Sequence, residues 1–338
     1  MSRLAQQRRH LRSRLFHSRS RNRRLRLESL EDRRLLAVIF HDISPDNSNL
    51  DATQPNGASM GRINGLASVG RQDLGTANND IFYAATEWGG LYKTTDGGVN
   101  WSFLERHLPL ATWDVEVDPA DVNRVYATSF YDGRVNPVSG IQVSLDGGNT
   151  WIHPLTADPD PAFENTANDN TPQAGYTSAN PRNELSAYGI AIQPDNTQNV
   201  FIGTSSGLAR STDAGATWDF ISPDPTPATP PPAASDVWDV VAQAGGIVDV
   251  VTDSGHFRSL DGGNTWAASS LPAGAISGGM ASIAASPDEN YVLFVTSTND
   301  QNVYESDDGG LNWASLGSRQ PNSRIPMVVT NQKSDDGD

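Results

Sequence analysis

An eight-residue pattern recurs five times in this chain of 338 residues, and it constrains the fold more than any other feature of the sequence. The pattern reads Ser/Thr-x-Asp-x-Gly-x-Asn/Thr-Trp, and its copies span residues 94–101, 144–151, 211–218, 259–266 and 306–313. Successive copies are 50, 67, 48 and 47 residues apart, measured from Trp to Trp. A repeat of about 40–50 residues is typical of β-propellers and of solenoids, in which each repeat forms one structural unit. The chain is therefore predicted to be an array of such units.

The residue types of this octapeptide fit a tight turn. A carboxylate in a turn accepts hydrogen bonds from backbone N–H groups that follow it, and a glycine two residues later can adopt the positive φ that such a turn requires. Alternating runs before each copy are typical of a hairpin strand. We predict that the five aspartates fasten turns and are not catalytic, and that each Trp covers its turn and packs beside the next repeat. The residues are Asp96 and Trp101, Asp146 and Trp151, Asp213 and Trp218, Asp261 and Trp266, and Asp308 and Trp313.

The copies resemble the Asp-box, or BNR, repeats of sialidases, xyloglucan-degrading glycosidases, sortilin-type receptors and photosystem assembly propellers. In those families the box is structural, so the resemblance implies a fold and no activity. It implies an all-β propeller of four-stranded antiparallel blades, which leaves only short sheet edges exposed. Aligned on its Trp, the second repeat shows four strand-like runs, at residues 111–117, 124–129, 141–144 and from 151 onward. The longest step between copies is explained by a polar insertion over residues 157–182.

Five complete blades are predicted, and closure of the ring remains open at this point. A sixth blade would combine residues 37–43 with residues 324–330, and the alternatives are a truncated propeller or a piece of a longer array. An open propeller would expose an edge prone to aggregation, so some closure is expected.

Charge divides the chain into a basic head and an acidic body. Residues 1–34 hold twelve Arg and three acidic residues, whereas the remainder holds 12 basic and 37 acidic residues. An acidic body repels phosphates, so no nucleic acid partner is expected. We predict an Arg-rich, disordered leader or targeting segment over residues 1–36, the propeller over 37–330 and an acidic, disordered tail over 331–338. No apolar run is long enough to span a membrane.

The end of the basic head resembles the LEPR-XLL leader of exported planctomycete proteins. The residues that match that leader in order are Leu30, Glu31, Arg33, Leu35, Leu36 and Ala37, whereas Asp32 stands where the family usually has Pro. The resemblance implies export to the cell surface or beyond it. A transit peptide into an organelle is the alternative, because the first 27 residues are rich in Arg and Ser and contain no acidic residue.

The absence of cysteine excludes disulfides, thiolate metal sites and cysteine nucleophiles. The histidines that fall in the repeats have no ligand spacing, so neither a metal site nor a cofactor is predicted.

Ligands are expected on the face opposite the octapeptide turns, where the chain enters each inner strand. Three repeats carry an aromatic residue at this entry, at Trp113, Tyr188 and Trp238, and aromatic rings beside carboxylates suit sugars. Asp114 and Asp239, two blades apart, would face each other across the channel as acid and base. The alternative is that the rings plug the channel and the aspartates cap strand ends. The predicted ligand-binding residues are Arg62, Asn64, Glu87, Trp88, Trp113, Tyr131, Tyr188, Trp238, Asp253 and His256.

Three functions fit these residues. The first is an exported, non-enzymatic propeller that binds a polysaccharide or a protein on that face. The second is a glycoside hydrolase acting on a β-glucan-type polysaccharide, with Asp114 and Asp239 as its carboxylates. The third, a photosystem-assembly-factor-like propeller, requires the transit-peptide interpretation of the head. Fold alone does not choose among them.

Overall fold

The computed structural model describes residues 63–69, 81–87, 89–104, 111–130, 139–154, 157, 185–224, 236–269, 271–272, 275, 280–286, 289, 291–297 and 302–318. The chain divides into two compact units, Met1–Asp42 and Ile43–Asp338, and every described residue belongs to the second. The Arg-rich head, the acidic tail and both segments of the sixth blade lie outside the described residues.

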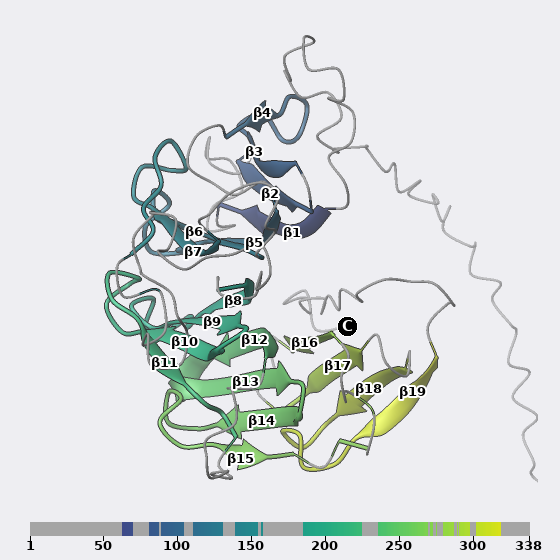
Figure 1. Cartoon of the computed structure of the whole chain (residues 1–338). Helices are drawn as coiled ribbons and strands as arrows, with labels where there is room; N and C mark the ends of the chain where they lie inside the picture. Colours follow the sequence, from purple (N-terminus) through teal and green to yellow (C-terminus); the bar gives the residue numbers. More distant parts are fainter. Residues whose placement is uncertain are drawn as a thin grey trace, which may run out of the picture. The chain divides into compact units, whose positions relative to one another are not determined.

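The described strands form five antiparallel sheets, each of which is a propeller blade (Figure 1). Blade 1 contains β1 (Ile63–Ser68), β2 (Phe82–Thr86), β3 (Gly90–Thr94) and β4 (Ser102–Phe103), and blade 2 contains β5 (Thr112–Val117), β6 (Val125–Ser129) and β7 (Gly140–Ser144). Blade 3 contains β8 (Ala187–Ile192), β9 (Val200–Thr204), β10 (Gly207–Ser211) and β11 (Asp219–Ile221). Blade 4 contains β12 (Val237–Gln243), β13 (Ile247–Thr252), β14 (Gly255–Ser259) and β15 (Ala267–Ala268), with a 3₁₀ helix, η2 (Ala244–Gly246), between its first two strands. Blade 5 contains β16 (Ala281–Ala285), β17 (Leu293–Ser297), β18 (Asn302–Ser306) and β19 (Ala314–Ser318).

The five-blade propeller predicted from the repeat is thereby confirmed. The fourth strand of blade 2 is reduced to a single bridge between Val143 and Ile152.

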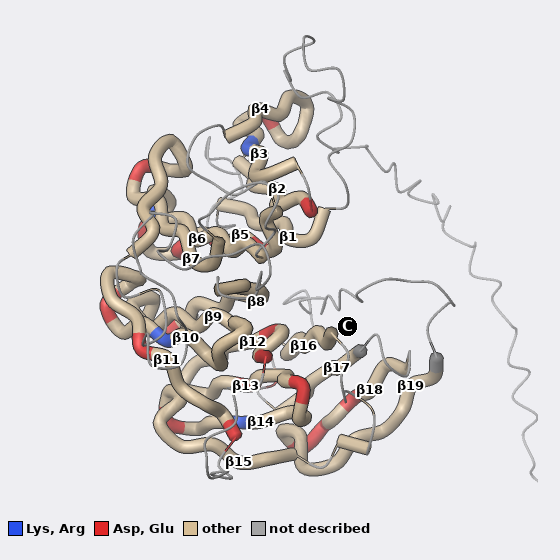
Figure 2. Tube along the Cα trace, in the orientation of Figure 1, with Lys and Arg blue, Asp and Glu red and all other residues tan. Residues whose placement is uncertain are grey.

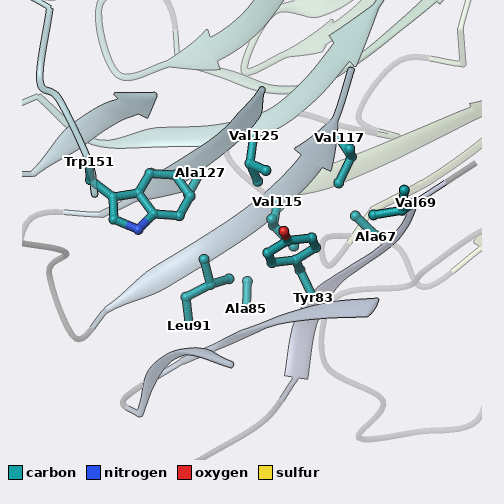
Figure 3. Close-up of a cluster of buried hydrophobic side chains, with 10 residues drawn as sticks. All are labelled: Ala67, Val69, Tyr83, Ala85, Leu91, Val115, Val117, Val125, Ala127 and Trp151. Carbon is teal, nitrogen blue, oxygen red and sulfur yellow. The ribbon is translucent and has the colours of Figure 1, made fainter. Parts of the chain in front are cut away.

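Successive blades stack so that their first strands are neighbours. The contacts run from β1 to β5, from β5 to β8, from β8 to β12 and from β12 to β16. We call these five the inner strands, and the packed surface between two successive blades a seam. Figure 3 shows the seam between blades 1 and 2, where Tyr83 and Leu91 meet Val115, Val125 and Trp151. Because these side chains are almost fully buried, apolar burial at the seams is a main source of stability.

The Trp residues of blades 2 to 5 pack against the preceding blade, which corrects the prediction that they pack beside the next one. Trp151 of blade 2 belongs to the core cluster of blade 1, and Trp218 of blade 3 belongs to that of blade 2. The physical reason is the face of the blade on which the octapeptide turn places its Trp. The turn places Trp151 on the same blade face as Val125 and Ala127, which look toward blade 1.

The octapeptide turns are fastened by their aspartates, as predicted. Thr150 donates to Asp146 through its backbone N–H (2.8 Å to Oδ1) and its hydroxyl (2.6 Å to Oδ2), and the Ser144 hydroxyl also donates to Oδ1, at 2.9 Å. The same donors recur around Asp213 and Asp261. The hydrogen bonds of Thr265 and Ser259 lower the pKa of Asp261 to about 2. These carboxylates are therefore charged and fully occupied, as structural groups should be.

The described Lys and Arg residues are few and lie away from the inner strands (Figure 2). Lys93 on β3 and Arg210 on β10 donate to carbonyls in the octapeptide turn of the following blade, Gly147 O at 2.8 Å and Gly262 O at 3.2 Å. The inner strands carry acidic residues and, along their described lengths, no Lys or Arg. Any carboxylate there lacks a cation on its own strand or on the neighbouring inner strands.

Candidate functional site

The three aromatic residues at the inner-strand entries form a continuous row. The ring of Trp113 lies 5.6 Å from that of Tyr188 in an edge-to-face contact, and Tyr188 lies 4.7 Å from Trp238 in a tilted contact. Tyr188 is only 7% exposed because it stands between the two half-buried Trp side chains. The blade alignment that grouped these residues is thus matched by their positions, and Trp113 and Trp238 are the members that retain accessible surface.

A β-bulge at each of these entries explains why the rings leave the strand ladder. The register of β5 shifts between Thr112 and Val115, and that of β12 shifts between Val237 and Asp239. A bulge bends the strand and redirects its side chains, and bulges are common beside functional sites. A β-bulge therefore turns the side chains of both Trp113 and Trp238 out of the regular strand pattern.

Carboxylates lie beside one end of the row. The indole Nε1 of Trp238 donates to Asp253 Oδ1 at 2.7 Å. Burial, together with the charges of Asp236 and Asp253, raises the pKa of the Tyr188 hydroxyl well above its usual range. An aromatic surface edged by carboxylate acceptors can contact the apolar face of a sugar and accept from its hydroxyls.

Asp114 is held between three blades. Its Oδ1 accepts from Val115 N at 2.9 Å on its own strand, and its Oδ2 accepts from Ile190 N at 3.0 Å on β8 of blade 3. A Cβ atom on Gly65 of blade 1 would lie 2.3 Å from Oδ1, so the carboxylate occupies the space that a side chain at residue 65 would need. Asp114 therefore ties its blade to both neighbours.

Asp239 repeats this arrangement two blades further on. Its Oδ1 accepts from Val240 N at 2.9 Å, and its Oδ2 accepts from Ser282 Oγ at 2.8 Å and Ile283 N at 3.0 Å on β16. A Cβ atom on Gly189 of blade 3 would lie 2.1 Å from Oδ1. Glycine and aspartate thus alternate from one inner strand to the next, as Gly65 on β1, Asp114 on β5, Gly189 on β8 and Asp239 on β12.

The two aspartates flank one strand instead of facing each other from opposite walls of a channel. Asp114 bonds Ile190 of β8, and Asp239 lies against the adjacent residue, Gly189. Their charges interact, because burial and then the charge of Asp239 raise the pKa of Asp114 to about 7. Burial raises the pKa of Asp239 to about 6.

Glu116 completes this group and was not among the residues predicted from the sequence. It follows Asp114 by two positions on β5, close enough for the charge of Asp114 to act on its carboxyl. Burial, and then the charge of Asp114, raise the pKa of Glu116 to about 8. We call Asp114, Glu116 and Asp239 the inner-strand carboxyls; their pKa values near neutrality suit proton transfer.

The other predicted residues have different positions. Asn64 donates through Nδ2 to Thr112 O at 3.1 Å and so joins blades 1 and 2, and Glu87 is half-buried just beyond β2. Arg62, Trp88 and Tyr131 lie outside the described residues.

His256 does not belong to the exposed face on which it was predicted. It is 1% exposed, its Nε2 lies 3.0 Å from Asp249 Oδ1, and its ring packs edge-on against Trp313 at 5.3 Å. Side chains alternate along β14, and this alternation turns His256 into the seam between blades 4 and 5. In that seam it contacts the octapeptide turn of blade 5 near Gly310.

Over the described ranges, no three His, Asp or Glu side chains are grouped as metal ligands. Nor does the part of the chain that the structure describes contain a helix with the length and apolar character of a membrane span.

Comparison with known proteins relates the chain to xyloglucanases. A xyloglucanase of Acetivibrio thermocellus is 26% identical over 257 residues, which cover 73% of this chain and 25% of that protein. A xyloglucanase of a Paenibacillus species is 26% identical over 221 residues, covering 57% of this chain and 20% of the other. The chain thus spans about a quarter of the length of these relatives. No protein-family model matches it.

Among solved structures, an ancestral GH74 enzyme superposes with a TM-score of 0.55 at 19% identity, over 81% of this chain and 32% of that enzyme. This likeness concerns the fold alone. The chain is a β-propeller with distant xyloglucanase relatives.

Proposed function

We propose that this chain is a propeller of a glycoside hydrolase that acts on a β-glucan-type polysaccharide. The observation that carries the proposal is the aromatic row Trp113–Tyr188–Trp238 beside carboxyls whose pKa values lie near neutrality. The distant relatives named as xyloglucanases support the same substrate class. We further propose that the octapeptide turns are Asp-box repeats and that the protein is exported, on the strength of the LEPR-XLL resemblance of its head.

In this proposal the aromatic row binds the polysaccharide and the inner-strand carboxyls cleave it. The accessible faces of Trp113 and Trp238 contact the apolar faces of sugar rings, and Asp253 accepts from sugar hydroxyls. The inner-strand carboxyls supply the acid and the base that cleavage of a glycosidic bond requires.

The test uses the full chain and a panel of soluble β-glucans that includes xyloglucan. Wild-type protein should release new reducing ends and should be retarded by the polysaccharide in affinity electrophoresis. Trp113→Ala and Trp238→Ala should each weaken retardation by up to about tenfold, because each removes an aromatic contact worth about 0.5–1.5 kcal/mol. Leu260→Ala is the matched control, since Leu260 lies 68% exposed on an octapeptide turn and should change neither measurement. If both Trp variants are retarded as strongly as the wild-type protein, Trp113 and Trp238 do not bind the polysaccharide.

A non-enzymatic glycan-binding propeller is the second candidate, and one observation favours it. Both oxygens of Asp114 and of Asp239 already accept hydrogen bonds from the inner strands, which is how structural carboxylates behave. This candidate predicts retardation by a polysaccharide without any release of reducing ends. The two measurements on wild-type protein therefore separate the candidates.

A further inference from the structure

The aromatic row ends at Trp238 beside two carboxylates. The indole Nε1 of Trp238 donates to Asp253 Oδ1 at 2.7 Å, and the backbone N–H of Asp253 donates to the Asp236 carbonyl at 3.1 Å, so both aspartates lie at this end of the row. Tyr188, whose ring centroid lies 4.7 Å from that of Trp238, experiences the charge of each. Trp238 and Asp253 are both half-buried and keep part of their surface open to solvent. We call Trp238, Asp236 and Asp253 the acidic end of the row.

The basic residues that the structure describes lie at the other end of the blades. Each of the four is placed beside an octapeptide turn, which joins the third strand of a blade to the fourth. Asp253 lies instead in the turn between β13 and β14, the second and third strands of blade 4, so antiparallel pairing puts it at the opposite end. The four are Lys93 and Arg210, which donate to Gly147 O and Gly262 O, Arg258, which a Cβ on Gly309 would approach to 3.1 Å, and Arg124, whose neighbour Asn123 accepts from Gly147 N at 2.8 Å. None of these four pairs with Asp253, so its charge is left for a ligand.

Resting on the proposed function, we propose that the acidic end binds a sugar ring that carries an ammonium group, and that the substrate is a β-glucan-type polymer with amino groups, of which chitosan is an example. The indole face of a Trp attracts a cation more strongly than the other aromatic side chains do, and a carboxylate beside it adds a charge-assisted hydrogen bond. A neutral sugar would use the ring and leave the charge of Asp253 unpaired.

Asp253 is the residue that selects the ammonium group. Its Oδ1 holds the indole edge of Trp238 in place, and no described residue donates to its Oδ2, which therefore accepts from the ammonium. Asp236 adds a second negative charge at the same end. The row continues through Tyr188 to Trp113, which contacts a further sugar of the chain. The additional rings favour a polymer of sugars over a single cationic side chain.

The test measures binding of two tetramers to the full chain by isothermal titration calorimetry, at a mildly acidic pH at which amino sugars are charged. The β-1,4-linked tetramer of glucosamine and cellotetraose share ring number and linkage and differ only in an amino group that replaces a hydroxyl. Wild-type protein should bind the glucosamine tetramer about tenfold or more tightly at low ionic strength. This preference should shrink at about 0.5 M salt, because salt screens the attraction between ammonium and carboxylate.

Asp253→Asn should lower the preference for the glucosamine tetramer by about fivefold or more, because the amide oxygen still accepts from the Trp238 indole while the charge is lost. Asp219→Asn is the matched control, since it removes the same charge from an exposed position on β11 and should leave the preference unchanged. Near-ultraviolet circular dichroism of both variants verifies that the aromatic row is intact. Tetralysine tests whether the site takes any cation, and it should bind more weakly than the glucosamine tetramer by about tenfold or more.

The outcomes separate this inference from the function on which it rests. If cellotetraose binds as tightly as the glucosamine tetramer, or Asp219→Asn lowers the preference as much as Asp253→Asn, the acidic end does not select an ammonium group and the hydrolase proposal stands. Tetralysine that binds as tightly as the glucosamine tetramer would make the acidic end a site for basic peptides and overturn the inference. If neither tetramer binds and no polysaccharide of the panel is retarded or cleaved, both proposals are wrong. Should Asp253→Asn fail to fold, the wild-type preference and its salt dependence decide alone.

Discussion

Glycine and aspartate alternate from one inner strand to the next, so that Gly189 lies against Asp239. We therefore predict that Gly189→Ala lowers the free energy of unfolding substantially. The added Cβ would lie 2.1 Å from Asp239 Oδ1 and 3.0 Å from both Cα and Cγ of that residue, whereas ordinary contact begins at 3.4 Å. The carboxylate would have to retreat by about 1.3 Å, the difference between 3.4 and 2.1 Å. Such a shift breaks its hydrogen bonds to Ser282 and Ile283.

The magnitude follows from those losses. Overpacking costs about 1–3 kcal/mol, and a hydrogen bond to a charged group contributes about 1.5–3 kcal/mol. Because strand movement relieves part of the strain, we expect Gly189→Ala to lower the free energy of unfolding by about 4 kcal/mol. In an Asp239→Ala background the clashing carboxylate is absent, and the same change should cost only about 1 kcal/mol.

Urea unfolding followed by tryptophan fluorescence measures all four proteins of this double-mutant cycle. The expected coupling between the two positions is about 3 kcal/mol, far above the few tenths seen for independent sites. Ser282→Ala serves as a calibration, since it removes one donor to the carboxylate and adds no atoms. If the two changes prove additive, Asp239 does not occupy the space beside Gly189, and the contact between blades 3 and 4 at this position is wrong.

Other predictions concern pH and the seams. The raised pKa values of the inner-strand carboxyls mean that the folded chain holds protons that the unfolded chain releases, so the melting temperature should rise as pH falls from about 8 to about 5. Glu116→Gln should flatten this rise in a circular dichroism series, and an unchanged slope would contradict the assignment. Below about pH 4 the sign reverses, because octapeptide carboxylates such as Asp261, whose pKa is lowered to about 2, lose stabilising charge as they are protonated. Trp218→Ala should cost about 3–5 kcal/mol of unfolding free energy in urea, because it empties the seam between blades 2 and 3, and a loss below about 1 kcal/mol would refute that packing. His256→Ala should cost about 3 kcal/mol by the same measurement, since it removes the ring packed on Trp313 and a hydrogen-bonding partner of a buried carboxylate; a neutral effect would place the ring outside the seam.

Much of the fold was predictable because its repeating unit depends on contacts close in sequence. Asp146 accepts from Thr150, four residues away, so the residues of the octapeptide suffice to form the turn. Expected strands of the second repeat, such as residues 111–117, begin within one residue of the observed β5 (Thr112–Val117). Trp113 and Trp238 could be grouped by alignment alone, because equivalent positions of a repeat occupy equivalent places in their blades.

Contacts between distant residues explain what the sequence alone did not reveal. The carboxylate of Asp114 is bonded by Ile190, 76 residues away, and no local pattern predicts that approach. The pKa of Glu116 is raised mainly by burial, and this burial exists only once the blades have assembled. The sequence by itself thus determined the propeller, its octapeptide turns and its aromatic positions, since these rest on local hydrogen bonds and on repetition. Only the tertiary structure decided that His256 is buried in a seam and that three carboxyls gather on the inner strands, because packing between blades and the loss of solvent are properties of the assembled fold.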